Sequence, residues 1–211
     1  MVRTVVTWAG VIDTLLLLLI GIGPKLALVP FLKITASMDV TTRARVTRKM
    51  LVTAGTAALT LVLLGELLRR LLHFTIGALS IAGGVILLVL AIELVLGRSS
   101  DESWNTAGAD PMRLAMVPLG VPFLLNPVGI VALVTISAEA GSVAVLAVEI
   151  AILAIVLLFD ALVFRLAARA TLDESRMIVI DKVFGFLIAA IAVQLVLDGL
   201  VSAGVIAHVT H

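Results

Sequence analysis

Residues 8–34 read WAGVIDTLLLLLIGIGPKLALVPFLKI, and this stretch sets the fold that the sequence predicts. It is long enough to cross a membrane, because a helix needs about 20 apolar residues to span the hydrocarbon core. Gly21, Gly23 and Pro24 interrupt it near the middle. Glycine adds conformational freedom, whereas proline removes a backbone donor and clashes with the preceding turn. The stretch therefore predicts a transmembrane helix that is broken inside the bilayer.

The remainder of the chain has the composition of a membrane protein. Of its 211 residues, 62% are hydrophobic and 14% are charged. A soluble domain averages about 45–50% apolar and about 25% charged residues. The sequence predicts an all-α polytopic protein with six transmembrane helices. Besides residues 8–34, the apolar stretches are residues 50–68, 74–96, 114–136, 143–163 and 183–205.

An internal repeat relates the two halves of the chain. Gly84 is followed ten residues later by Leu-Val-Leu, and so is Gly185, which lies 101 residues further on. The pair Gly23-Pro24 lies 103 residues before Asn126-Pro127. A repeated unit of three helices must be inverted in the membrane, as in many secondary transporters. We expect two inverted three-helix repeats, residues 1–97 and 113–211, joined by a cytoplasmic linker at 98–112.

Basic residues are distributed unequally between the predicted loops. The first, third and fifth loops and their flanks hold eleven lysines and arginines, and the opposite side holds three. Cytoplasmic loops carry the excess of positive charge in membrane proteins. The pattern therefore predicts that these loops are cytoplasmic and that both termini lie outside.

The fourth apolar stretch contains a second predicted break, at Pro122, Asn126, Pro127 and Gly129. One break alone would indicate a kink, since Pro and Gly are frequent in membrane helices. Two breaks in matching positions indicate a substrate site, because half-helix ends present partial charges near the midplane. The predicted substrate-binding residues are Gly21, Gly23, Pro24, Lys25, Asn126, Pro127 and Gly129.

Charged residues within the apolar stretches are few. Lys25 either holds a substrate carboxylate or extends its ammonium to the interface, and the sequence leaves both interpretations open. Buried acids are typical of proton relays in transporters. The predicted proton-coupling residues are Asp13, Glu93 and Asp160.

Other kinds of function find little support in the residues. The chain has no cysteine, its histidines lie at ends or in loops, and no metal-ligand spacing is visible. We expect no cofactor and no catalytic residue, because an enzyme needs a convergent set of such side chains. A net charge of +1 without a basic patch argues against nucleic acid. A Walker-type phosphate loop is also absent, which argues against ATP as the driver.

The sequence resembles the MarC family of bacterial inner-membrane proteins, which is grouped with the LysE-type exporters. Four segments carry the resemblance: IGIGPKLALVPFLKITASM (20–38), AGGVILLVLAIELVLG (82–97), VPLGVPFLLNPVGIVALVTIS (117–137) and VFGFLIAAIAVQLVLDGL (183–200). It implies six helices in two inverted repeats and export or uptake of a small molecule, with small neutral amino acids as the leading class. The broken helices of the family fall on Gly23, Pro24 and Pro30 and on Pro122, Asn126, Pro127 and Gly129.

The two breaks depart from the family pattern. The family usually has Asn-Pro-Ile-Gly in the first break and Gly-Pro-Gly in the second. This chain has Gly-Pro-Lys first and Asn-Pro-Val-Gly second, so its substrate can differ. We expect a secondary transporter of small polar solutes in the bacterial cytoplasmic membrane, with the bilayer and a small molecule as partners. A homo-oligomer, a scaffolding role and a membrane-embedded enzyme stay open as alternatives.

Overall fold

The computed structural model describes residues 8–96, 110–169 and 174–206, and most of these residues are helical. Most of the predicted linker at 98–112 lies outside these ranges. A single antiparallel bridge between Ile22 and Leu125 is the only strand-like pairing in them. The elements are α1 (Trp8–Gly21), α2 (Pro24–Ile34), α3 (Val40–Leu71), α4 (Ile76–Leu96), α5 (Pro111–Leu114), η1 (Ala115–Leu124), α6 (Pro127–Glu139), α7 (Val143–Ala167) and α8 (Glu174–Ser202).

Four of the described helices are long and apolar enough to cross a membrane: α3, α4, α7 and the part of α8 from Lys182 to Ser202. The remaining apolar helices are shorter, because the chain breaks between α1 and α2 and again before α6. The prediction of an all-α membrane protein is therefore confirmed at this level.

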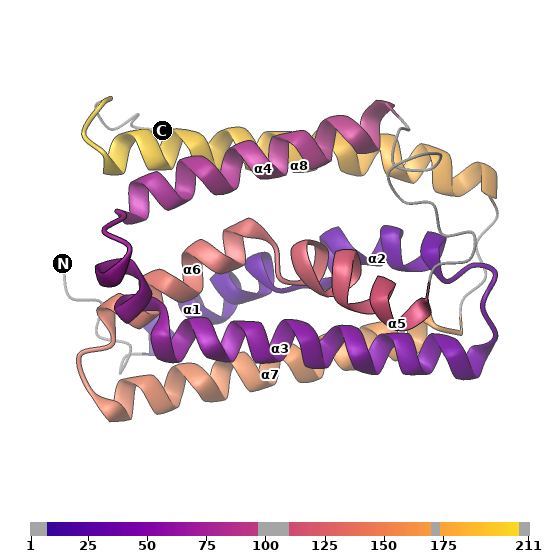
Figure 1. The fold of residues 1–211 in the computed structure, drawn as a ribbon, viewed down its shortest axis with the longest axis horizontal. Helices are drawn as coiled ribbons and strands as arrows, with labels where there is room; N and C mark the ends of the chain where they lie inside the picture. The colour runs from indigo at the N-terminus through magenta and orange to yellow at the C-terminus, as the bar shows by residue number, and fades with distance from the viewer. Residues whose placement is uncertain (1–7, 97–109, 170–173, 207–211) are drawn as a thin grey trace.

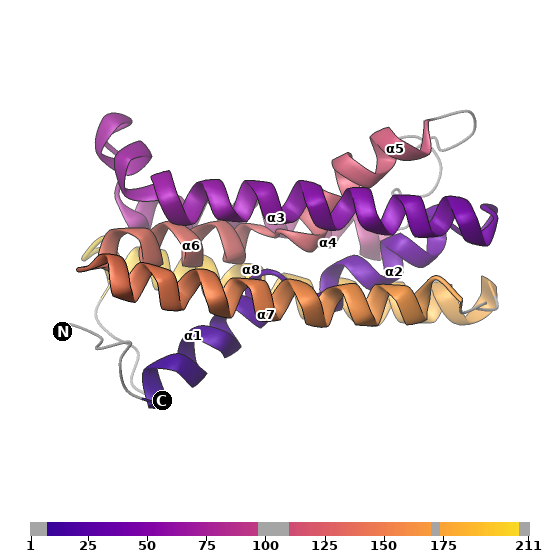
Figure 2. The same cartoon turned by 90° about the horizontal axis from the view of Figure 1, so that it is seen from below.

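The helices form three layers (Figure 1). Helices α4 and α8 lie side by side in one outer layer, and α3 and α7 lie together on the opposite side. The short elements α1, α2, η1 and α6 lie between these two pairs in Figure 1, and the turned view in Figure 2 shows that α1 and α5 project sideways from the bundle. The residues where the broken helices meet, Ile22, Leu125 and Asn126, are buried, whereas Trp8 and Ile12 of α1 are exposed.

Glycines allow α4 and α8 to approach closely in antiparallel orientation. A Cβ atom added at Gly84 would lie 2.7 Å from the carbonyl oxygen of Ala192. A Cβ added at Gly185 would lie 3.3 Å from the carbonyl oxygen of Ala91. Small residues at membrane helix interfaces permit such backbone contact. The two contacts are reciprocal, because Gly84 and Gly185 lie 101 residues apart in the chain and so do Ala91 and Ala192.

Two pairs of helices begin at the same interval along the chain. Helices α2 and α6 begin at Pro24 and Pro127, and α3 and α7 begin at Val40 and Val143. The interval is 103 residues in both cases (127 − 24 and 143 − 40). It equals the spacing found in the sequence between the two predicted breaks.

Helix α3 begins earlier than the apolar pattern predicts. The predicted boundary at residue 50 is wrong, because the basic segment from Val40 onward is already helical. The reason is local: the carboxylate of Asp39 accepts hydrogen bonds from the backbone N–H groups of Thr41 and Thr42, at 3.0 and 3.1 Å. This is an N-cap, which satisfies donors that have no partner within the helix. Helix α8 likewise begins at Glu174, before the predicted residue 183.

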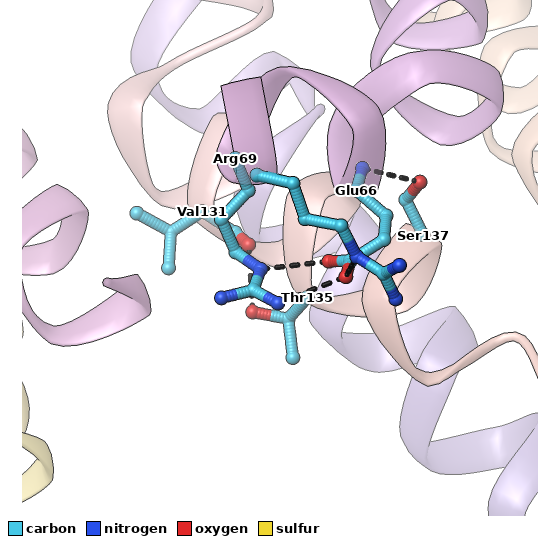
Figure 3. A network of polar contacts seen from close by, with 6 residues as sticks. Glu66, Arg69, Val131, Thr135 and Ser137 are labelled. Carbon is cyan, nitrogen blue, oxygen red and sulfur yellow. Dashed lines mark hydrogen bonds and ion pairs between the residues drawn. The ribbon is translucent and has the colours of Figure 1, made fainter. Parts of the chain in front are cut away.

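An ionic cluster lies near the end of α3 (Figure 3). Glu66 pairs with Arg69 at 2.7 Å and with Arg70 at 2.5 Å, as expected for residues at a membrane interface. The backbone N–H of Glu66 donates to the Ser137 hydroxyl of α6 at 3.0 Å. Gly65 makes room for this contact, because a Cβ there would lie 3.1 Å from the α-carbon of Val134. The cluster attaches the short helix α6 to the long helix α3.

Candidate functional site at the junction of the broken helices

The two breaks meet each other inside the molecule. Ile22 and Leu125 form the antiparallel bridge, and both are completely or almost completely buried. The backbone N–H of Asn126 donates to the carbonyl oxygen of Gly21 at 3.2 Å. The unwound backbone of each break is thus partly satisfied by the other one. This agrees with the rule that irregular backbone within a membrane must be covered by protein or line a cavity.

The first break has the composition that the sequence suggested. Gly23 is extended and precedes α2, which begins with Pro24 in its first turn, where a missing N–H costs nothing. A Cβ atom at Gly23 would lie 2.2 Å from the carbonyl oxygen of Leu19, so only glycine fits there. Pro30 does not take part in the break. It lies within α2, which continues to Ile34, so the expectation that Pro30 belongs to the broken segment is wrong.

The second break is longer than predicted. Within η1, Val117 and Val121 have extended backbone angles, and each precedes a proline, Pro118 or Pro122. The ring of a proline disfavours the helical conformation for the residue before it. The sequence interpretation included Pro122 but missed Pro118. The signal was available in the repeated Val-Pro of VPLGVP, whose two prolines lie four residues apart.

Gly21 and Gly129 lie in direct backbone contact where the two segments cross. A Cβ atom added at Gly129 would lie 2.3 Å from the carbonyl oxygen of Gly21. One added at Gly21 would lie 2.3 Å from the α-carbon of Gly129. Both residues were predicted for the substrate site, and the structure brings them together. Their contact shows that this part of the junction is filled by backbone.

Asn126 connects the two breaks through its side chain. Its Oδ1 accepts a hydrogen bond from the backbone N–H of Gly129 at 3.1 Å and so caps α6. Its Nδ2 donates to the carbonyl oxygen of Ile20 at 3.2 Å. The residue is 0% exposed. The amide is therefore occupied on both sides within the protein, and Asn126 acts here by holding the breaks together.

The start of α2 differs from the start of α6. Gly23 occupies the position that matches Asn126, and no side chain caps α2. Lys25, the second residue of α2, is half-buried. It forms no ion pair or hydrogen bond with another residue in the described ranges. The α2 end thus combines uncapped N–H donors, the positive end of a helix dipole and an ammonium group.

Comparisons with known proteins agree with this architecture. The model of a family described as "MarC family integral membrane protein" matches residues 8–203. The chain belongs to the MarC family of integral membrane proteins. A UPF0056 membrane protein of Methanocaldococcus jannaschii is 28% identical over 85% of this chain and 90% of its own length. The inner membrane protein YhgN of Escherichia coli is 25% identical over 90% of this chain and 95% of its own length. No solved structure matches the chain.

The three predicted proton-coupling acids of this MarC family member have different surroundings. Asp13 is exposed on α1, and Glu93 is half-buried on α4. Asp160 on α7 is 0% exposed, and neither of its carboxylate oxygens has a hydrogen-bond partner in the part of the chain that the structure describes. The structure does not bring the three together, and Asp160 makes no hydrogen bond with Lys25.

The sequence interpretation did not include one further buried acid among the proton-coupling candidates. Glu149, also on α7, is 2% exposed, and its Oε2 has no hydrogen-bond partner among the described residues. Glu149 and Asp160 lie eleven residues apart, which is close to three helical turns and places them on one face of α7. That spacing was the signal that could have identified the pair.

Proposed function

We propose that this MarC family member is a secondary transporter of small polar solutes, with its substrate site at the junction of the two broken helices. The observation that carries the proposal is the antiparallel pairing of Ile22 with Leu125, which brings the starts of α2 and α6 to one place. Interrupted helices that meet inside the membrane provide dipole ends and unpaired backbone groups for ions and zwitterions. In this proposal the half-helix ends themselves form the substrate site, and the site needs no cofactor.

Small neutral amino acids are the substrate class that this chemistry favours. Their carboxylate would bind the uncapped end of α2, where helix N–H groups and Lys25 both attract anions. Their ammonium would bind carbonyl oxygens at the ends of α1 and η1, which are negative dipole ends. In this proposal Lys25 faces the site, and Asn126, Pro127, Gly21 and Gly129 shape it without contacting the solute through side chains.

Alternating access is the mechanism that we propose for this site. The proposed architecture has six membrane-crossing segments in two inverted halves, residues 1–97 and 113–211, whose movement relative to each other would open the site to either side. The equal interval of 103 residues between helix starts supports such a repeat, and so does the reciprocal packing of Gly84 and Gly185. Loops one, three and five would face the cytoplasm and both termini the outside.

Counterflow of labelled glycine and alanine in proteoliposomes tests the proposal. We expect exchange above that of empty liposomes for the intact protein. Replacing Lys25 with Gln should weaken the apparent affinity by about tenfold, the usual loss for one charge-assisted hydrogen bond of about 1.5 kcal/mol. Lys33→Gln is the matched control, since Lys33 is also half-buried but lies at the other end of α2. Absence of flux for these two and for a wider panel of amino acids and small polar solutes would refute transport.

A further inference from the structure

We infer that Glu149 and Asp160 are the two proton-binding groups that couple transport to a proton gradient, Glu149 on the outer side of the breaks and Asp160 on the inner side. This inference rests on the proposed transport function and adds its coupling ion. It also replaces the three scattered acids Asp13, Glu93 and Asp160 with two acids on a single helix face.

The positions of the two acids along α7 are nearly symmetric. The middle of α7 is Ile155, and Glu149 lies six residues before it and Asp160 five residues after it. At 1.5 Å per residue the distances along the axis are about 9 Å and about 8 Å. One carboxyl group therefore lies on each side of the centre of the helix, and both face the interior of the molecule.

Contacts with the first broken helix place the break between these two levels. Phe164 of α7 packs edge-on against Phe31 of α2, with ring centroids 5.2 Å apart. Phe31 follows Pro24, the start of α2, by seven residues, and α2 and α7 run in the same direction (Figure 1). Seven residues make about two helical turns, and the residue two turns before Phe164 in α7 is Leu157. The break is therefore level with the segment of α7 between Glu149 and Asp160. Helix α7 also contacts α1, and thus follows both parts of the broken helix.

Within the described ranges neither acid has a hydrogen-bond partner that would stabilise its charge. Oε2 of Glu149 and both oxygens of Asp160 are buried without a hydrogen bond. An ionised carboxylate in such surroundings is unfavourable, and the protonated form is favoured instead. Between them on the same face lie Leu153 and Val156, which are buried and apolar. A carboxyl group that is neutral when enclosed and ionised when water reaches it is suited to carry a proton.

The charged groups on neighbouring helices do not change this conclusion. The charged neighbour of Glu149 is Glu139 at the exposed end of α6, which is a like charge and not a partner. The elements packed against α7 are α1, α2 and α3, and none of their charged side chains in the described ranges hydrogen-bonds to Asp160. Those side chains are Asp13 on α1, Lys25 and Lys33 on α2, and Arg43, Arg45, Arg48, Lys49, Glu66, Arg69 and Arg70 on α3.

A proton fits these sites better than a metal cation does. Sodium-like and divalent cations need several oxygen ligands around them. Within the described ranges no group of three or more Asp, Glu, His or Cys side chains comes together. In the proposed step a proton from water on one side of the membrane binds a carboxylate oxygen and forms an O–H bond. After the two halves move, this bond breaks and the proton is released to water on the other side of the membrane.

Two transport assays on the same proteoliposomes test the inference. In the first, counterflow of labelled alanine is measured without any gradient. In the second, accumulation of alanine is driven by an imposed pH gradient. We expect the counterflow of Asp160→Asn and Glu149→Gln to stay within about threefold of that of the intact protein. Their gradient-driven accumulation should be at least tenfold lower than that of the intact protein. Glu93→Gln is the control and should keep both activities. An imposed sodium gradient should not drive accumulation in any of the proteins.

The outcomes separate this inference from the transport proposal. If the intact protein shows no flux of any solute, the transport function fails, and the inference with it. If the intact protein transports but Asp160→Asn and Glu149→Gln accumulate alanine as well as it does, only the inference fails. Accumulation driven by sodium would also overturn it.

A measurement on the unmodified protein covers the case of a variant that does not fold. Dicyclohexylcarbodiimide reacts with protonated carboxyl groups in apolar surroundings, and labelled peptides can be identified by mass spectrometry. We expect labelling at Glu149 and Asp160 that declines as the pH is raised, with no labelling at Asp39, which is exposed and lies outside the apolar stretches. Labelling of neither buried acid at any pH would overturn the inference.

Discussion

The carbonyl oxygen of Gly21 lies so close to Gly129 that a Cβ atom on Gly129 would be 2.3 Å away from it. Two segments that are 108 residues apart in the chain (129 − 21) thus touch through their backbones. The bridge between Ile22 and Leu125 and the hydrogen bond from Asn126 to Gly21 lie directly beside this contact. The candidate site depends on the closeness of these segments.

Replacing Gly129 with Ala should therefore destabilise the protein. The new methyl group would overlap backbone atoms, which cannot move aside as a flexible side chain can, and such overpacking costs about 1–3 kcal/mol or more. We expect a lower thermal midpoint in detergent and loss of counterflow. Gly141→Ala is the matched control, because nothing lies within 4 Å of a Cβ at Gly141. Equal midpoints for the two variants would contradict the close contact.

The α4–α8 interface offers a test that includes a rescue. Gly84→Ala should lower the thermal midpoint, because its Cβ would lie 2.5 Å from Cγ2 of Val196 and 2.7 Å from the Ala192 carbonyl oxygen. Adding Val196→Ala removes the first overlap but not the second, so the double variant should recover part of the loss. Ala82→Val, at an exposed position of the same helix, should be nearly neutral. No difference between single and double variants would show that Val196 does not limit the approach.

Asn126 provides a test of how the breaks are connected. Asn126→Ala removes the cap of α6, worth about 1 kcal/mol. It also removes the hydrogen bond from Nδ2 to the carbonyl oxygen of Ile20, which is part-buried and worth about 0.5–1.5 kcal/mol. Asn126→Ser should be milder, because serine is also a good N-cap. We expect thermal stability to fall in the order native, Ser, Ala, and maximal flux to fall with it while apparent substrate affinity changes little. A large loss of affinity at unchanged stability would indicate direct substrate binding by the amide.

Asp39 makes the stability of α3 dependent on pH. Hydrogen bonds from the hydroxyl and backbone of Thr41 and from Thr42 hold the pKa of Asp39 well below its usual value of 3.8. Because the folded-state pKa is depressed, the stabilisation is complete above pH 3.8 and is lost as the pH falls toward the folded-state value. Thermal midpoints from pH 7 to pH 3 should show the native protein losing its advantage over Asp39→Asn below about pH 4. Thr41→Val should shift that loss to higher pH, and parallel curves for all three proteins would refute the cap.

Sequence periodicity was a good guide to the helices and a poorer one to their ends. The basic residues after Val40 belong to α3, because hydropathy does not register an N-cap such as Asp39. Pro30 was expected at a break but is accommodated within α2, whereas Pro118 was missed and adds an extended residue to η1. Proline by itself does not say whether a helix bends, ends or continues, since the outcome depends on what covers the freed backbone groups.

The sequence alone determined that the chain is an all-helical membrane protein and that two segments are broken at Gly23-Pro24 and Asn126-Pro127, because composition and local backbone chemistry suffice for both. Only the tertiary structure decided that these breaks pair with each other. It also decided that the amide of Asn126 is occupied within the protein, and that Glu149 and Asp160, not Asp13, are enclosed. Those properties depend on contacts between helices about 100 residues apart in the chain. Neighbours in space, and not neighbours in the chain, decide whether a polar group is buried and whether it finds a hydrogen-bond partner.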